Sequence, residues 1–183
     1  SLFDYAPAAH EFLGDAVELG RSFVQPAYWG SRSLDYLWQG IGAYLRHRPQ
    51  VRWLFGPVSL SASLPPAARD WIVHCHRHYF GDHEKLAVAR NPYQVGRRVE
   101  IEASALWQGR DLRDGLAALK QQLASLDTTL PTLYRQYVDL CEPEGVRFLA
   151  FGVDPDFGGC VDGLIRLDLA QLKFTKRARY IDR

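Results

Sequence analysis

The feature that most constrains the fold is a run of alternating elements between residues 16 and 60. Residues Ala16 to Val24 contain β-branched and aromatic positions and are followed by Pro26, which predicts a strand ended by a residue without an N–H. Gly30 and a Ser-Arg-Ser turn then lead into a helical pattern that stops before Pro49, with apolar residues at Leu34, Leu37, Trp38, Ile41 and Leu45. Val51 to Leu60 is nearly all apolar, as in a central strand covered on both faces. The order strand, helix, strand predicts an α/β fold with a mixed central sheet and flanking helices.

The rest of the chain continues this alternation. Prolines at the first turn predict a helix that runs from Ser63 to about Tyr79. Leucines at helical spacing predict an amphipathic helix at Leu112 to Leu126 and a second helix at Leu130 to Leu140. Before the first of these two amphipathic helices, an imperfect alternation predicts a strand at Arg98 to Leu106. Two further strands, Val146 to Val153 and Cys160 to Leu169, flank the turn-rich residues 154–159 and predict a hairpin.

Composition narrows the class of protein. The chain has 183 residues, of which 47% are hydrophobic, enough for one globular domain with a core of its own. Lys and Arg number 22 against 21 for Asp and Glu, so the overall charge does not indicate a nucleic-acid partner. The three cysteines, Cys75, Cys141 and Cys160, lack the spacing of a disulfide framework or a zinc ribbon, which favours a reducing cytoplasm. Neither a signal peptide nor an apolar run of membrane-spanning length is present in this sequence.

The turn that leads into the first long helix is a candidate anion site. Backbone N–H groups at a helix N-terminus are unpaired and carry partial positive charge, so a phosphate group can bind there. The positions Val24, Pro26, Tyr28, Gly30 and Leu34 resemble the run V-x-P-x-Y-R-G-x-G-x-G-x-x-L, which binds the carrier pyrophosphate in Gcn5-related (GNAT) acyltransferases. Two positions depart from that run, with Trp29 in place of Arg or Gln and Arg32 in place of a glycine.

Longer strings resemble one subgroup of that family. The residues of 18–24 (ELGRSFV), 37–41 (LWQGI), 54–59 (LFGPVS) and 152–157 (GVDPDF) are similar to bacterial GNAT N-acyltransferases that are commonly labelled hemolysins. Relatives of this subgroup include the ornithine-lipid and glycine-lipid N-acyltransferases. The E-x-x-R pattern of Glu18 and Arg21 is also distantly similar to a strand of the acyl-homoserine-lactone synthases.

The resemblance implies an enzyme that transfers a fatty acyl group, with 3-hydroxyacyl groups among the candidates, to the amino group of an amino acid and so makes a lyso-aminolipid. It implies an acyl-carrier protein with its phosphopantetheine, or acyl-CoA, as the donor, and no permanently bound cofactor or metal. Glu18 and Arg21 are the expected catalytic residues, with Glu18 accepting the amine proton. The residues expected to bind the carrier are Phe23, Val24, Tyr28, Gly30, Ser31, Arg32 and Ser33.

The resemblance also implies a domain organisation. The family's fold opens with a strand, two helices and two strands before the motif strand, whereas only about fifteen residues precede Glu18 here. We therefore expect residues 1–172 to form a partial GNAT domain, with a helical insertion at about 80–145. Residues 173–183 form a basic tail with interleaved aromatics, which predicts contact with the acidic carrier protein or an anionic membrane surface at the inner face.

Several alternatives remain open from the sequence. A signal synthase that acylates and then cyclises an amino-acid derivative would use the same fold, and so would a non-catalytic module that binds acyl carriers or membranes. Glu18 and Arg21 could instead pair for structural reasons. His74 and His78 share a helix face, yet no third ligand accompanies them, and a solvated basic face explains them without metal. Cys75 is predicted to be a buried, inert thiol.

Overall fold

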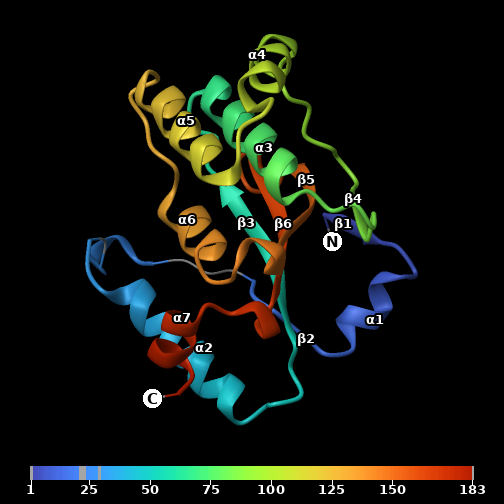
Figure 1. Ribbon diagram of the computed structural model, residues 1–183, viewed down its shortest axis with the longest axis vertical. Coiled ribbons are helices and arrows are strands. Elements are labelled where there is room, and N and C mark those ends of the chain that lie inside the picture. The colour runs from blue at the N-terminus through green and yellow to red at the C-terminus, as the bar shows by residue number, and fades with distance from the viewer. Residues whose placement is uncertain (1, 21–23, 29, 183) are drawn as a thin grey trace.

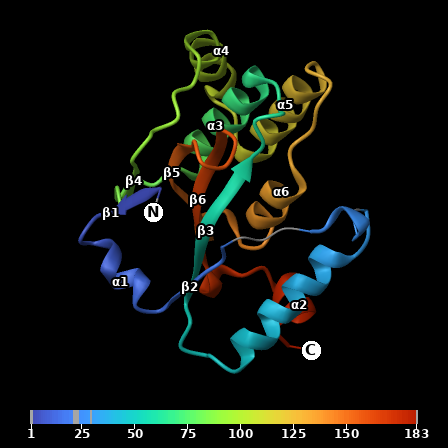
Figure 2. The same ribbon diagram turned by 180° about the vertical axis from the view of Figure 1, so that it is seen from behind.

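The computed structural model describes residues 2–20, 24–28 and 30–182 of the chain. Figure 1 shows a twisted central sheet with helices on both sides, and Figure 2 shows the same arrangement from behind. The sheet has four strands in the order β2-β3-β6-β5, formed by Ala16–Glu18, Trp53–Leu60, Cys160–Asp168 and Val146–Asp154 respectively. β2 is parallel to β3, and the other pairs are antiparallel. The predicted α/β fold with a mixed sheet is confirmed.

Side chains alternate between the two faces of the sheet and so form two hydrophobic clusters. On one face Leu54, Val58 and Ile165 belong to the larger cluster, which the long helices cover. On the other face Phe55 and Leu164 pack under a smaller layer. This layer consists of the helix α1 (Ala9–Leu13) and a separate two-stranded sheet of β1 (Phe3–Tyr5) and β4 (Ala87–Ala89).

The helices of the larger layer are α2 (Ser33–Arg46), α3 (Pro66–Phe80), α4 (Arg97–Trp107), α5 (Leu112–Ala124), α6 (Thr132–Val138) and α7 (Phe174–Tyr180). Four of them, α2, α3, α5 and α6, lie close to the predicted positions, and two, α4 and α7, were not predicted as helices. Short 3-10 turns lie at Pro26–Tyr28, Pro143–Gly145 and Leu169–Gln171. The strand predicted at Arg98 to Leu106 is wrong, because this segment is α4. Its buried residues Val99, Ala103 and Trp107 are four apart, which is the period of a helix rather than of a strand.

The hairpin predicted from residues 146–169 is confirmed. β5 and β6 pair from Val146 opposite Leu167 to Asp154 opposite Cys160, with an irregularity between Phe148 and Ala150. The Asp154 carboxylate accepts hydrogen bonds from the backbone N–H groups of residues 156 and 157. The turn then closes through two glycines with φ of 63° and 72°, a conformation that other residues rarely adopt.

The basic C-terminal segment is a helix that packs on the domain. Figure 1 shows α7 beside α2, at the end of the sheet away from α3. Lys173 and Lys176 both contact the carboxylate of Asp139, at 2.8 and 2.6 Å, and Arg179 pairs with Asp35 at 2.7 Å. Three of the cations that the sequence assigned to an external anionic partner therefore already have partners within the domain.

No helix in the described part of the chain is long and apolar enough to span a membrane.

Candidate active site

Glu18 lies at the end of β2, the edge strand of the central sheet. It pairs in register with Phe55 on β3, and its side chain is exposed. Tyr5 of β1 packs edge-on against Phe55, with ring centroids 6.3 Å apart. Burial and, secondarily, the negative charge of Glu18 raise the pKa of Tyr5, so the Tyr5 hydroxyl lies within range of the Glu18 charge. The structure thus brings a tyrosine hydroxyl, which sequence reasoning missed, into the surroundings of the candidate base.

The pairing of β2 with β3 ends directly after Glu18, for a reason encoded in β3. The last bond runs from the Leu19 N–H to the Phe55 carbonyl, at 2.7 Å. In a parallel ladder the next bond would come from the N–H of residue 57, which is Pro57 and has none. The Leu19 carbonyl lies instead over Gly56, where a side chain would begin only 2.9 Å from the Leu19 carbonyl carbon. Gly56 and Pro57 therefore allow β2 to cross close to β3 and then to leave it.

The predicted strand Ala16 to Val24 is only partly described. β2 covers Ala16–Glu18, and residues 21–23 lie outside the described residues. The expected roles of Arg21 and Phe23 therefore remain predictions. Gly20 is exposed, and the nearest atom to a side chain built there would be the Glu18 Oε1, at 4.0 Å. The space beside the Glu18 carboxylate is consequently open on this side.

The turn before α2 has the form expected of an anion site. Gly30 has a φ of 74°, and the Ser31 hydroxyl donates to the Tyr28 carbonyl at 2.6 Å. The Ser31 oxygen also accepts from the Ser33 backbone N–H at 3.2 Å. At the N-cap, Arg32 offers no side-chain acceptor to the helix, so the N–H groups that follow Ser33 in the first turn of α2 have no cap from this residue. The structure places four of the predicted carrier-binding residues in this single turn.

Two arginines lie at the same helix end, and they share one carboxylate. Arg32 contacts Asp35 at 2.9 Å, and Arg179 of α7 contacts it at 2.7 Å. The hydrogen bond from Arg32, with further bonds from Arg179 and Tyr180, lowers the pKa of Asp35 to about 2. Since Asp35 neutralises only one of the two cations, a net positive charge remains beside the N-terminus of α2. Arg179 is 144 residues from Asp35, and no sequence signal pointed to it.

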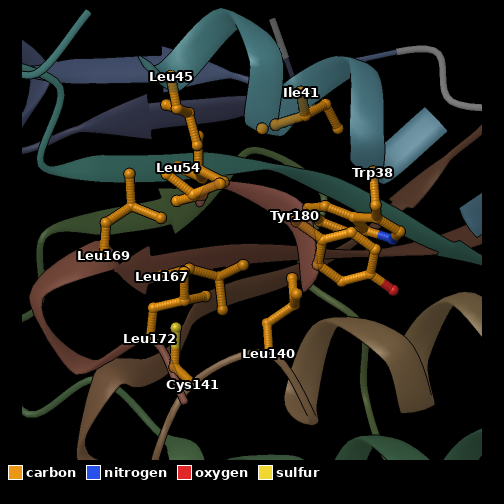
Figure 3. Close-up of a pocket in the computed structure, with 12 residues that line it drawn as sticks. Trp38, Ile41, Leu45, Leu54, Leu140, Cys141, Leu167, Leu169, Leu172 and Tyr180 are labelled. Carbon is orange, nitrogen blue, oxygen red and sulfur yellow. The ribbon is translucent and has the colours of Figure 1, made fainter. Parts of the chain in front are cut away.

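Apolar side chains line both sides of α2. On its outer side an apolar groove of about 440 Å³ lies between α2 and β2, with Val17 and Leu19 on the strand side. On its inner side a small apolar cavity of about 20 Å³ lies between α2, the sheet and α7 (Figure 3). Ile41, Leu45 and Leu54 contribute to both, so these three side chains form the wall between groove and cavity.

The histidine and cysteine residues of α3 have structural contacts. His74 accepts a hydrogen bond at Nδ1 from the Trp107 indole N–H, at 2.9 Å, and its Nε2 lies 3.8 Å from Glu100. The ring of His78 packs edge-on against Tyr79. Cys75 is fully buried, and burial raises the pKa of its thiol to about 12, which agrees with the prediction of an inert thiol.

Comparisons with known proteins agree with this geometry. Residues 1–39, which contain β2 and the turn before α2, match the family described as acetyltransferase (GNAT) domain. The chain is 28% identical over 178 residues to a glycine N(alpha)-acyltransferase of Bacteroides thetaiotaomicron, covering 93% of this chain and 52% of that protein. It is 27% identical over 179 residues to a glycine N(alpha)-acyltransferase of Phocaeicola vulgatus, covering 94% of this chain and 54% of that protein.

The resemblance to GNAT-type amino-acid N-acyltransferases is confirmed. A 51-residue segment, 28% of this chain, is 43% identical to an L-ornithine N(alpha)-acyltransferase of Brucella abortus and covers 18% of that protein. The chain spans about half the length of the glycine N-acyltransferases that it matches. No solved structure matches the chain.

Proposed function

We propose that this chain provides the donor-binding part of an N-acyltransferase that moves a fatty acyl group from an acyl carrier to the amino group of an amino acid. One observation supports this most directly. Glu18 ends the stretch of β2 that pairs with β3, and the strand parts from β3 one residue later, on its way to the turn before α2. A carboxylate, an open strand edge and a helix N-terminus thus follow one another along a single segment. The names of the relatives, glycine and L-ornithine N(alpha)-acyltransferase, agree with an amino-acid acceptor.

The donor binds, in this proposal, along the segment from Glu18 to α2. Its phosphate groups accept hydrogen bonds from the first N–H groups of α2 and from Ser31 and Ser33, and Arg32 and Arg179 contribute positive charge. Both acyl-CoA and the phosphopantetheine of an acyl-carrier protein carry such a phosphate. The arginines at this end of α2 favour an acidic carrier protein as the donor.

The fatty acyl chain lies, in this proposal, in the apolar groove beside α2. Val17 and Leu19 alternate with Glu18 along β2, so they face the groove while the carboxylate faces the other side of the sheet. Tyr36, Leu37 and Tyr44 of α2 are among the most exposed large hydrophobic side chains of the described residues, with exposed fractions of 61%, 40% and 49%. Covering this surface with an acyl chain removes apolar area from water, which favours a long-chain donor.

The reaction is a direct transfer. The amine nitrogen attacks the thioester carbonyl, the new C–N bond forms, and the C–S bond breaks to release the carrier thiol. Glu18 accepts the proton that the ammonium group must lose before attack and passes it to water, and the second proton, which the nitrogen loses after the C–N bond forms, goes to the departing thiolate. Positioning of the two substrates accounts for the remaining acceleration.

Replacement of Glu18 by Gln tests the proposal. The variant keeps the shape of the side chain but cannot accept a proton, so we expect the turnover number of the complete protein to fall by about 10²–10⁴. Binding of the donor should change little, and activity should recover at higher pH as free amine becomes abundant. The control is Glu142→Gln, which changes an exposed carboxylate on the loop after α6.

Four results would contradict this assignment in different ways. Near-normal turnover in folded Glu18→Gln eliminates the residue as the base, and unfolding of this variant alone favours structural pairing with Arg21. A cyclised lactone among the products identifies a signal synthase instead. Donor binding without any product, in the unmodified protein, indicates a non-catalytic carrier-binding module.

A further inference from the structure

Arg166 lies on the same face of the sheet as Glu18. Its contacts within the domain leave part of its guanidinium group without a hydrogen-bond partner among the described residues. Arg166 is directly opposite Phe55 on β3, and Phe55 is directly opposite Glu18 on β2. Residues paired in this way point to the same face, and adjacent strands are about 4.8 Å apart, so two strand spacings of about 10 Å in total separate the backbones of Glu18 and Arg166. The guanidinium group lies beside two aromatic rings, 4.6 Å from the centroid of Trp53 and 5.4 Å from that of Phe12.

The side chain of Arg166 is only 12% exposed, and the carboxylate that it contacts balances its positive charge poorly. It forms an ion pair with Glu84 at 3.3 Å, which is longer than the 2.7–2.9 Å typical of a charge-assisted bond. Its Nε is buried and has no hydrogen-bond partner among the described residues. Arg147 is directly opposite on β5 and adds a like charge. Burying a cation under these conditions is costly, so its retention indicates that a carboxylate ligand completes the site.

The guanidinium group faces two surface hollows. One has a volume of about 510 Å³ and the other about 330 Å³, and Trp53, Glu84 and Arg166 line both of them. The larger hollow also contains the carboxylates of Glu11 and Asp15. A cationic guanidinium beside two further carboxylates is complementary to a zwitterion, which carries one charge of each sign.

We propose that Arg166 binds the α-carboxylate of the amino-acid acceptor, which displaces Glu84 from the guanidinium group. The inference rests on the proposed function, and it names the anchor of the second substrate. An acceptor held there lies on the Glu18 face of the sheet, opposite the apolar groove assigned to the acyl chain. The rings of Phe12 and Tyr5 both pack edge-on against Phe55, which lies between the two polar residues in the sheet. The donor and the acceptor thus approach the place where β2 and β3 separate from opposite faces of the sheet.

Two variants with opposite expected effects test this role. In Arg166→Met the apolar stem remains but the carboxylate loses its partner, so the KM for glycine or ornithine should rise about 10–100-fold. The KM for the donor should remain unchanged. In Glu84→Gln the competing internal carboxylate is absent, so the KM for the same amino acid should fall. Methylamine and putrescine, which lack the carboxylate, should show no such dependence on either variant.

Calorimetric titration of the amino acid into the protein, with a non-hydrolysable donor analogue present, measures the same site without turnover. Circular dichroism establishes that each variant is folded. A folded Arg166→Met variant that binds glycine and ornithine as the unmodified protein does would overturn the inference and leave the proposed function intact. So would equal losses for the amino acids and their decarboxylated analogues, or an unmodified protein that binds neither amino acid. Loss of turnover in Glu18→Gln with acceptor binding intact tests the chemistry separately.

Discussion

The substitution Gly42→Ala, which adds a single methyl group, should displace α7 from its position on α2. Gly42 is buried in α2, and a side chain built there would begin 2.5 Å from the carbonyl carbon of Tyr180 and 3.3 Å from its Cα. These are backbone atoms, so a change of side-chain rotamer cannot relieve the overlap. α7 must therefore retreat by about 1 Å or more, which weakens the packing of Tyr180 on Trp38 and the contacts of Arg179 and Tyr180 with Asp35.

The expected cost of Gly42→Ala follows from this overlap. Overpacking at a well-packed contact typically costs about 1–3 kcal/mol, and in a domain of this size each kcal/mol lowers Tm by about 2–4 °C. We therefore expect Tm to fall by about 2–12 °C. Gly40, two residues earlier in the same helix, has nothing within 4 Å of the corresponding position. Gly40→Ala should stabilise the helix by about 0.5–1 kcal/mol and raise Tm.

Thermal unfolding by circular dichroism measures both shifts, and limited tryptic digestion measures the accessibility of the basic residues in α7. Faster cleavage at Lys176 and Arg177 in Gly42→Ala, but not in Gly40→Ala, would locate the change in α7. If the two substitutions instead raise Tm equally and leave cleavage unchanged, the close approach of α7 to α2 is wrong.

Two further predictions concern buried features of the fold. His76 is fully buried against Phe148, and burial lowers its pKa from about 6.5 to about 4. Between pH 6.5 and pH 4, His76 therefore binds a proton in the unfolded chain but not in the folded chain. The free energy of unfolding should fall by up to about 3 kcal/mol over this interval and level off below pH 4. His76→Phe should lack this portion of the decline in urea unfolding; an identical pH profile would refute the assignment. Replacement of Pro57 by Val supplies an N–H that can bond to Leu19 and extend the pairing of β2 with β3. We expect the donor KM to rise several-fold with the amine KM unchanged; unaltered donor kinetics would show that Pro57 does not keep the strands apart.

The sequence determined the elements whose side chains repeat with a clear period. The strand-helix-strand order of residues 16–60, the helix at α5 and the hairpin of β5 and β6 all follow from local patterns of apolar residues, turn residues and prolines. The candidate base and the turn before α2 could be named for the same reason, since they lie within one continuous segment. α4 was misread because a pattern of four-residue spacing over eleven residues also contains short stretches that alternate.

Only the tertiary structure decided how segments far apart in the chain meet. The sequence assigned the C-terminal cations to an external anionic partner, and the structure shows that α7 is also held on α2 by Asp35 and on the loop after α6 by Asp139. Arg166 had no distinguishing pattern in the sequence, and its role depends on rings contributed by α1 and β3. Hydrophobic periodicity reports the local preference of the backbone and the burial of one face. The partner of a buried charge depends on which distant elements pack together, and that information is not contained in any local window of residues.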